Sequence, residues 1–132
     1  MVIKMKTRNF SKKREAILAK IRSTTCHPSA EWVYQELKDE HPKLSLGTVY
    51  RNIGMFKDEG TVISVGTIDG QERFDGDIAP HGHFVCKVCR AVLDFPLPPL
   101  LLETAGRLDA TGAAVDRVEL TTYGTCTTCL EA

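Results

Sequence analysis

The sequence of 132 residues predicts an α+β chain in two parts, the first made of three helices and a β-hairpin and the second a small α/β unit. Three observations predict this division. Apolar residues recur at helical spacing up to residue 60 and in short β-type runs after it. The pattern breaks at residues 75–80, a polar stretch with Gly and Pro. Both Cys-x-x-Cys pairs lie beyond that break, where a metal can hold together a unit too small to be secure alone. We therefore expect domains at 1–74 and 81–132 with a hinge at 75–80.

The first helix is expected to run from Lys12 to about Ser23, with Ser11 as its N-cap. Its apolar face consists of Ile17, Leu18 and Ile21. Its start is basic, with Lys12, Lys13 and Arg14 in a row. Positive charge there opposes the helix dipole, so a negatively charged partner is one interpretation and a solvated charged face the other.

The second helix is expected to begin after Ser29 as N-cap and to end near His41-Pro42, with Trp32, Val33 and Leu37 facing inward. Ser45 then caps a third helix that ends at Gly60. The inward residues of the third helix are Leu46, Val49, Ile53 and Phe56. Its opposite side presents Gly47, Thr48, Arg51, Gly54 and Met55, with Tyr50 and Asn52 at the flanks. A face of small residues with a few hydrogen-bonding side chains suits the major groove of DNA.

Two β runs, 61–68 and 71–74, follow and are joined at Asp69-Gly70, a strong hairpin signal. Three short helices and a hairpin, with a basic first helix, are typical of a winged helix-turn-helix domain. A small helical domain that binds no nucleic acid is the alternative. In the second part we expect strands at 83–86 and 91–95, a helix at 100–108 and a strand at 114–122.

The charge supports the division, although the chain as a whole is neutral. Residues 1–74 carry 13 basic and 9 acidic side chains, whereas residues 75–132 carry 4 and 8.

No apolar run is long enough to span a membrane, and no signal peptide is recognisable, so we expect a cytoplasmic protein.

Four cysteines form the strongest motif: Cys86, Cys89, Cys126 and Cys129. Two Cys-x-x-Cys turns can complete a tetrahedral structural Zn(II) site, worth about 10–16 kcal/mol in model peptides. A redox-active iron site of four thiolates and a pair of thiol/disulfide switches are the alternatives. The fifth cysteine, Cys26, is most simply a small apolar side chain, with a redox or extra-ligand role as the alternative.

A second set of residues offers harder donors: His27, Asp75, His81, His83 and Asp94. His81 and His83 are two apart, so both face the same side of an extended strand. Mixed imidazole and carboxylate donors suit Fe(II), Mn(II) or Zn(II).

Four segments of the chain together resemble the ferric-uptake-regulator superfamily, over almost the whole chain from Ser11 to Cys129. These segments are His27-Pro-Ser-Ala-Glu-Trp-Val-Tyr34, Ser45-Leu-Gly-Thr-Val-Tyr-Arg-Asn52, Arg73-Phe-Asp75 and His81-Gly-His-Phe-Val-Cys-Lys-Val-Cys89. The pattern is most similar to the peroxide-responsive branch, because Asp75 and Asp94 stand where many relatives have Glu. Pro80 and Gly82 replace residues that build an additional metal site in iron-uptake regulators, so that site is expected to be absent. Lys12-Lys13-Arg14 departs from the usual Pro-Gln-Arg.

The resemblance implies that one regulatory Fe(II) or Mn(II) ion is bound by His27, Asp75, His81, His83 and Asp94. It further implies a homodimeric repressor on a palindromic operator in double-stranded DNA, with the second part as dimerisation domain and no membrane partner. The expected DNA contacts are Lys12, Lys13, Arg14, Thr48, Tyr50 and Arg51. Peroxide, the only small molecule expected to act on the protein, would oxidise His27 or His81.

An enzyme and two different kinds of regulator are the competing hypotheses. A zinc deaminase or hydrolase needs an open zinc position and a nearby Glu base, commonly His-x-Glu, and the sequence contains no His-x-Glu. We therefore expect no enzyme. The competing regulators are a thiol-based redox regulator and an iron- or zinc-uptake repressor on the same fold.

Overall fold

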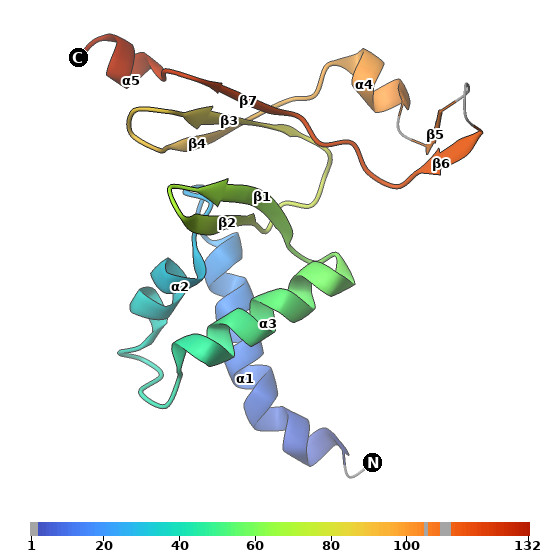
Figure 1. Cartoon of the computed structure of the whole chain (residues 1–132). Helices are drawn as coiled ribbons and strands as arrows, with labels where there is room; N and C mark the ends of the chain where they lie inside the picture. Colours follow the sequence, from blue (N-terminus) through green and yellow to red (C-terminus); the bar gives the residue numbers. More distant parts are fainter. Residues whose placement is uncertain (1–2, 105, 109–111) are drawn as a thin grey trace. The chain divides into compact units, whose positions relative to one another are not determined.

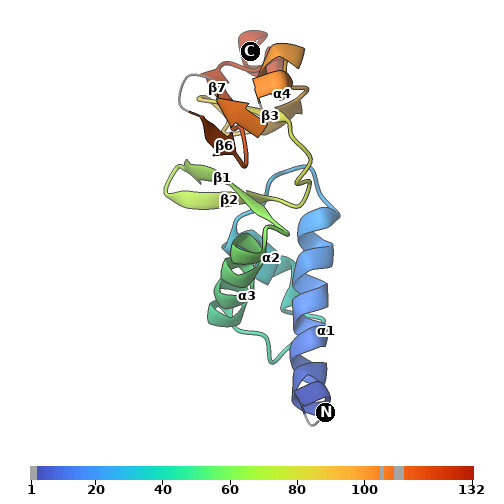
Figure 2. The same ribbon diagram turned by 90° about the vertical axis from the view of Figure 1, so that its right-hand side faces the viewer.

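The computed structural model describes residues 3–104, 106–108 and 112–132 (Figures 1 and 2). The chain divides into two compact units, Met1–Ile78 and Ala79–Ala132. Helices dominate the first unit and short strands the second, which confirms the α+β class. Among the described residues, no helix has the length and apolar character that crossing a membrane requires.

The helices of the first unit are α1 (Ile3–Arg22), α2 (Ala30–Leu37) and α3 (Leu46–Glu59). The hydroxyls of Ser29 and Ser45 accept the backbone N–H groups of Trp32 at 3.2 Å and Thr48 at 3.1 Å. Gly60 closes α3 in the left-handed region at φ 76°. The predicted N-caps Ser29 and Ser45 and the predicted C-terminal glycine are therefore confirmed.

Two predicted helix boundaries are wrong. α1 begins at Ile3, so Ser11 lies inside the helix; residues 3–10 contain no Gly or Pro that would stop it from extending. α2 ends at Leu37 instead of near His41. Pro42 disfavours helical backbone at the residue before it, and the His41 N–H instead closes a turn on the Leu37 carbonyl at 2.9 Å.

A hairpin completes the first unit, with β1 (Ile63–Ile68) antiparallel to β2 (Gln71–Asp75). Asp69 and Gly70 both have positive φ, 55° and 82°, as a tight two-residue hairpin turn requires. Figures 1 and 2 show the hairpin at the end of the helices where α1 finishes. The core joins the three helices to β2 and to Val62, the residue before β1; its members are Ile17, Ile21, Ala30, Val33, Leu37, Leu44, Val49, Ile53, Phe56, Val62 and Phe74.

The second unit is built on a three-stranded sheet in the order β4-β3-β7. The central β3 (Gly82–Cys86) runs antiparallel to β4 (Val92–Phe95) and parallel to β7 (Thr121–Gly124). Its other elements are α4 (Pro99–Thr104), β5 (Gly106–Leu108), β6 (Ala113–Val115) and α5 (Thr127–Leu130). The parallel pairing joins the beginning of this unit to its end.

The structure corrects two expectations in this unit. The helix expected over 100–108 ends at Thr104, and Gly106, a poor helix former, begins β5. The single strand expected over 114–122 is two strands, β6 and β7, with 116–120 between them. They have different partners, because β6 pairs with β5 whereas β7 pairs with β3. One continuous strand could not serve both sheets.

Candidate metal centres and nucleic-acid interface

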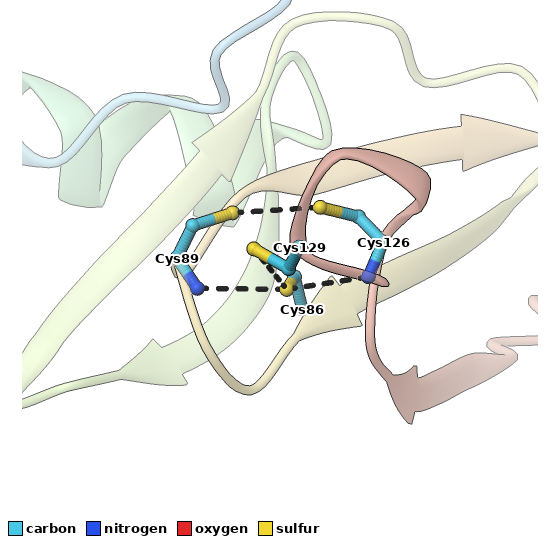
Figure 3. A group of neighbouring side chains, drawn as sticks. All are labelled: Cys86, Cys89, Cys126 and Cys129. Atoms are coloured by element: carbon cyan, nitrogen blue, oxygen red, sulfur yellow. Dashed lines mark hydrogen bonds between the residues drawn. The ribbon is translucent and has the colours of Figure 1, made fainter. Parts of the chain in front are cut away.

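The four cysteines of the second unit meet at one end of its sheet (Figure 3). Cys86 ends β3, and Cys89 follows it in the turn before β4. The parallel register pairs Cys86 with Gly124, two residues before Cys126. Cys126 is the N-cap of α5, and Cys129 lies within that helix. The sheet therefore places both Cys-x-x-Cys turns side by side, although 36 residues separate them.

The sulfur positions fit a tetrahedral metal ion. All four Sγ atoms lie within 4.8 Å of one another. The Cys86–Cys129 and Cys89–Cys126 Sγ pairs are both 3.8 Å apart. Zn–S bonds of about 2.3 Å in a tetrahedron give an S···S edge of about 3.8 Å, whereas a disulfide needs about 2.05 Å. The geometry therefore fits a structural zinc site and not a pair of disulfides.

Backbone N–H groups prepare this cluster for negative charge. The N–H groups of Cys126 and Cys89 point at the Cys86 sulfur, at 3.4 and 3.5 Å. They lower the pKa of the Cys86 thiol to about 6. The hydrogen bond to the Cys126 side chain, together with burial, raises the pKa of Cys129 to about 12. Four thiolates this close together need a cation between them to ionise together.

A pair of harder donors lies in the first unit. His27, just before α2, directs Nε2 at Oδ2 of Asp75, the last residue of β2, over 3.2 Å. Both side chains are buried, with 2% and 10% of their surface exposed. The other carboxylate oxygen of Asp75 accepts the N–H of Asp77 at 2.8 Å. The carboxylate is therefore oriented with one oxygen toward the imidazole.

A group of three donors lies in the second unit. The Nε2 atoms of His81 and His83 lie 3.2 and 3.4 Å from Oδ1 of Asp94. The register of β3 on β4 pairs His83 with Asp94. On the far side of its ring, Nδ1 of His81 lies 2.6 Å from the Ala79 carbonyl. Donation to that carbonyl leaves the Nε2 lone pair facing the carboxylate, and second-shell hydrogen bonds of this kind are typical of metal-binding histidines.

The donor chemistry of these two groups fits a borderline or hard divalent cation. Each brings imidazole nitrogen and carboxylate oxygen atoms together, with no sulfur. When both are unprotonated, a nitrogen lone pair and a carboxylate oxygen at 3.2 Å repel, so a proton or a cation must lie between them. The residues present are therefore suitable ligands for Fe(II), Mn(II) or Zn(II).

The outer face of α3 carries the side chains expected to contact DNA. Arg51 is exposed, and its Nη2 donates to the Thr48 hydroxyl oxygen at 3.0 Å. A Cβ at Gly47 would lie 3.5 Å from Arg51 Nη1, an ordinary van der Waals contact, so the guanidinium passes directly over this glycine. Tyr50 is 47% exposed and donates its phenol proton to Glu31 of α2. That hydrogen bond raises the pKa of Tyr50.

Asn52, expected at the flank of this face, is buried with 1% of its surface exposed. Its Nδ2 donates to the Thr48 carbonyl at 2.9 Å within α3. The amide therefore belongs to the inner side of the helix. It is not available to a partner of the outer face.

The three consecutive basic residues of α1, Lys12, Lys13 and Arg14, differ in their surroundings. Lys12 is exposed and Lys13 half-buried. Arg14, the third basic residue of this segment, packs against α3 and keeps 31% of its side chain exposed. Its guanidinium carbon is 4.8 Å from the centre of the Phe56 ring, and it forms an ion pair with Glu59. Cation–π attraction and charge pairing make Arg14 a link between α1 and α3.

Two residues gain contacts that sequence reasoning missed, Glu31 and Arg73. Glu31 receives the Tyr50 phenol, and Arg73 donates to the carbonyls of Cys26 and His27. Arg73 precedes Asp75 by two positions, so both occupy one face of a strand. This i, i+2 spacing is the sequence signal from which a role for Arg73 beside Asp75 could have been predicted. The Cys26 side chain itself is exposed.

Comparison with known proteins shows a family match and similar chains. The model of the ferric uptake regulator family matches residues 5–123. The chain is 34% identical over 118 residues to the peroxide-responsive repressor PerR of Staphylococcus aureus (strain USA300), which covers 88% of this chain and 78% of that protein. The structure is similar to that of the Campylobacter jejuni peroxide stress regulator, with a TM-score of 0.83 and 25% identity over 97% of this chain and 96% of the other. The Vibrio cholerae ferric uptake regulator gives a TM-score of 0.67 and 28% identity, covering 86% of this chain and 88% of the other.

Proposed function

The chain belongs to the ferric uptake regulator family, and from that premise we propose that it is a cytoplasmic DNA-binding repressor that senses peroxide through a regulatory Fe(II) or Mn(II) ion. The family consists of metal-dependent transcriptional regulators and not of enzymes. The observation that carries the proposal is the pair of imidazole–carboxylate groups, one in each unit. They accompany a separate cluster of four cysteines, so structural and regulatory metals have different ligands.

The cysteine cluster holds Zn(II) and serves the fold. Its ligands are Cys86, Cys89, Cys126 and Cys129. A closed site of four thiolates has no position for substrate or water, so its role is structural. Since the cluster ties β3 to the C-terminal helix α5, the second unit depends on it.

The regulatory ion is bound by His27 and Asp75 together with His81, His83 and Asp94. These ligands come from the DNA-binding domain at 1–74, the hinge at 75–80 and the dimerisation domain at 81–132. Binding of all five to one ion requires one particular arrangement of the two parts, so metal affinity biases their orientation. In a homodimer that arrangement sets the spacing of the two α3 helices across a palindromic operator.

Fe(II) held by these residues would supply the redox chemistry that cleaves peroxide, with one peroxide oxygen added to an imidazole, which is thereby oxidised, and the other released as water. The chain's own contribution is to hold the imidazoles of His27 and His81 where they can take up oxygen. An oxidised imidazole is a poorer ligand, so the two parts separate and the operator is released. With Mn(II) in the same ligands, repression persists because peroxide is not reduced.

DNA is read by the outer face of α3. Arg51 is the best candidate for a guanine edge, since a guanidinium fork matches two acceptors, and Thr48 and Tyr50 contact neighbouring base edges or phosphates. Lys12 and Lys13 contact phosphates or the minor groove. Arg14, on the same helix, contacts phosphates or the minor groove with them, and its ion pair with Glu59 of α3 orients its guanidinium.

The test is operator binding by zinc-loaded protein carrying Fe(II) or Mn(II), each before and after micromolar peroxide. We expect both forms to bind, and only the Fe(II) form to lose the operator after peroxide. Release by a thiol oxidant without iron would favour a thiol-based regulator. Binding that depends on iron or zinc supply but is indifferent to peroxide would favour an uptake repressor, a function suggested by the likeness to the Vibrio cholerae ferric uptake regulator.

A further inference from the structure

We propose that Arg73 is a positioning residue that holds His27 in its ligand conformation before any metal binds. The inference rests on the proposed function, because it takes His27 as a ligand of the regulatory ion. All the contacts that carry it lie within the first unit, Met1–Ile78.

The backbone of His27 is in an unfavourable conformation. Its φ is 54°, in the left-handed region that residues with a Cβ rarely adopt. The imidazole is also buried, with 2% of its surface exposed. Strained backbone persists only where surrounding contacts enforce it, and such residues cluster at functional sites. The contacts that hold the His27 backbone at positive φ must therefore come from nearby elements.

Strand β2 provides those contacts through two consecutive residues. The Arg73 side chain donates Nε–H to the His27 carbonyl and Nη2–H to the Cys26 carbonyl, the latter at 2.5 Å. The backbone N–H of Phe74 donates to the Pro28 carbonyl at 2.9 Å. Three successive carbonyls, those of residues 26–28, are thus held from β2. A planar guanidinium suits this task because its fixed fork reaches two acceptors at once.

The alternation of side chains along β2 places Asp75, a proposed metal ligand, on the same face as Arg73. Arg73 and Asp75 lie on one face of the strand, and Asp75 directs Oδ2 at His27 Nε2 over 3.2 Å. Glu72 and Phe74 lie on the other face, where both meet Lys57 of α3. Lys57 Nζ is 2.8 Å from the Glu72 carboxylate and 5.8 Å from the centre of the Phe74 ring. One strand therefore holds the His27–Asp75 pair on one face and α3 on the other.

The experiment measures Mn²⁺ affinity of the full-length, zinc-loaded chain by the electron paramagnetic resonance signal of free Mn²⁺. Loss of a second-shell partner typically weakens metal binding about 10- to 100-fold, and we expect Arg73→Met to fall in that range. Arg73→Lys should lie between Arg73→Met and the parent, because one ammonium cannot reproduce the fork. Lys57→Met, which removes a cation from the opposite face of β2, is the matched control and should leave Mn²⁺ affinity unchanged.

A second readout needs no regulatory metal. Amide hydrogen exchange in peptides covering residues 24–31 should accelerate in Arg73→Met and not in Lys57→Met. A lowered melting temperature with unchanged Mn²⁺ affinity and unchanged exchange would show a merely structural role and overturn the inference. His27→Ala separates the two proposals. If it weakens Mn²⁺ binding while both Arg73 variants do not, only the positioning role fails; if it has no effect, the proposed regulatory site fails.

Discussion

Tyr50 on the outer face of α3 donates its phenol proton to the carboxylate of Glu31 on α2. The two residues are 19 positions apart and both belong to the helix-turn-helix part of the first unit. The contact ties the exposed side chain of one helix to the helix that precedes it. The orientation of a residue expected at the DNA surface therefore depends on a residue outside that surface.

The pKa of Tyr50 reports this contact. The hydrogen bond to Glu31 and the nearby negative charge favour the neutral phenol and raise its pKa. Glu31→Gln removes the charge and should bring the pKa down toward the usual value of about 10. Ultraviolet difference titration of tyrosinate would measure the change. Tyr50→Phe is the control, since a Glu31→Gln substitution in that background should leave the tyrosine titration unaltered.

Removal of zinc should unfold the second unit. Cys126→Ser deletes one of four ligands and leaves three sulfurs without a complete site, so we expect loss of stoichiometric zinc and of β-sheet circular dichroism. Cys26→Ser is the matched control, because that cysteine lies outside the cluster and its side chain is exposed. Full zinc content and an unchanged unfolding transition in Cys126→Ser would contradict a structural role.

Arg51 and Lys12 should differ in what they contribute to DNA binding. Arg51→Ala should cost about 1–3 kcal/mol on the specific operator and relax the preference at one base position. Lys12→Ala should weaken specific and random DNA about equally and reduce the salt slope by about one. Fluorescence anisotropy over a range of salt concentrations measures both quantities. Equal losses on both DNAs for Arg51→Ala would argue against base contact.

Peroxide treatment of the Fe(II) form should add oxygen to the peptides that carry His27 or His81. Mass spectrometry of the digested protein detects the added mass. The peptide with His41 is the internal control, because this histidine lies in the turn between α2 and α3 and is in neither donor group. Protein loaded with Mn(II) should remain unmodified at all of these sites. Oxidation confined to cysteines would rule out the histidine mechanism.

A side chain at Gly82 would require the Phe95 ring to move. A Cβ there would lie 2.4 Å from Cζ of Phe95, whereas at Gly124 the nearest atom, Cε2 of Phe84, is 3.2 Å away. Overpacking of this kind costs about 1–3 kcal/mol, so Gly82→Ala should lower the free energy of unfolding by that amount. Gly124→Ala is the matched comparison and should cost less. Urea unfolding of the zinc-loaded protein gives both values, and equal costs would argue against the packing explanation.

Local chemistry explains what could be predicted from the sequence. Ser29 and Ser45 cap their helices, Gly60 ends α3, and Asp69-Gly70 turns the hairpin. Each of these depends on hydrogen bonds or backbone preferences within about four residues. The two Cys-x-x-Cys pairs are recognisable for the same reason, because each pair is complete within one turn.

Tertiary structure decided what depends on residues far apart. The parallel pairing of β3 with β7 joins residues far apart in the sequence, such as His83 and Thr121. This pairing brings the two cysteine pairs together, and it separates β7 from the rest of the strand expected over 114–122. Two other sets of contacts also join residues more than 40 positions apart. Arg14 packs on the Phe56 ring and pairs with Glu59. Arg73 donates hydrogen bonds to the carbonyls of residues 26 and 27. By itself the sequence determined which residues can bind metal, where α2 and α3 begin, where α3 ends and where the hairpin turns. Only packing decided which side chains meet, because burial and long-range pairing outweigh local preference wherever the two compete.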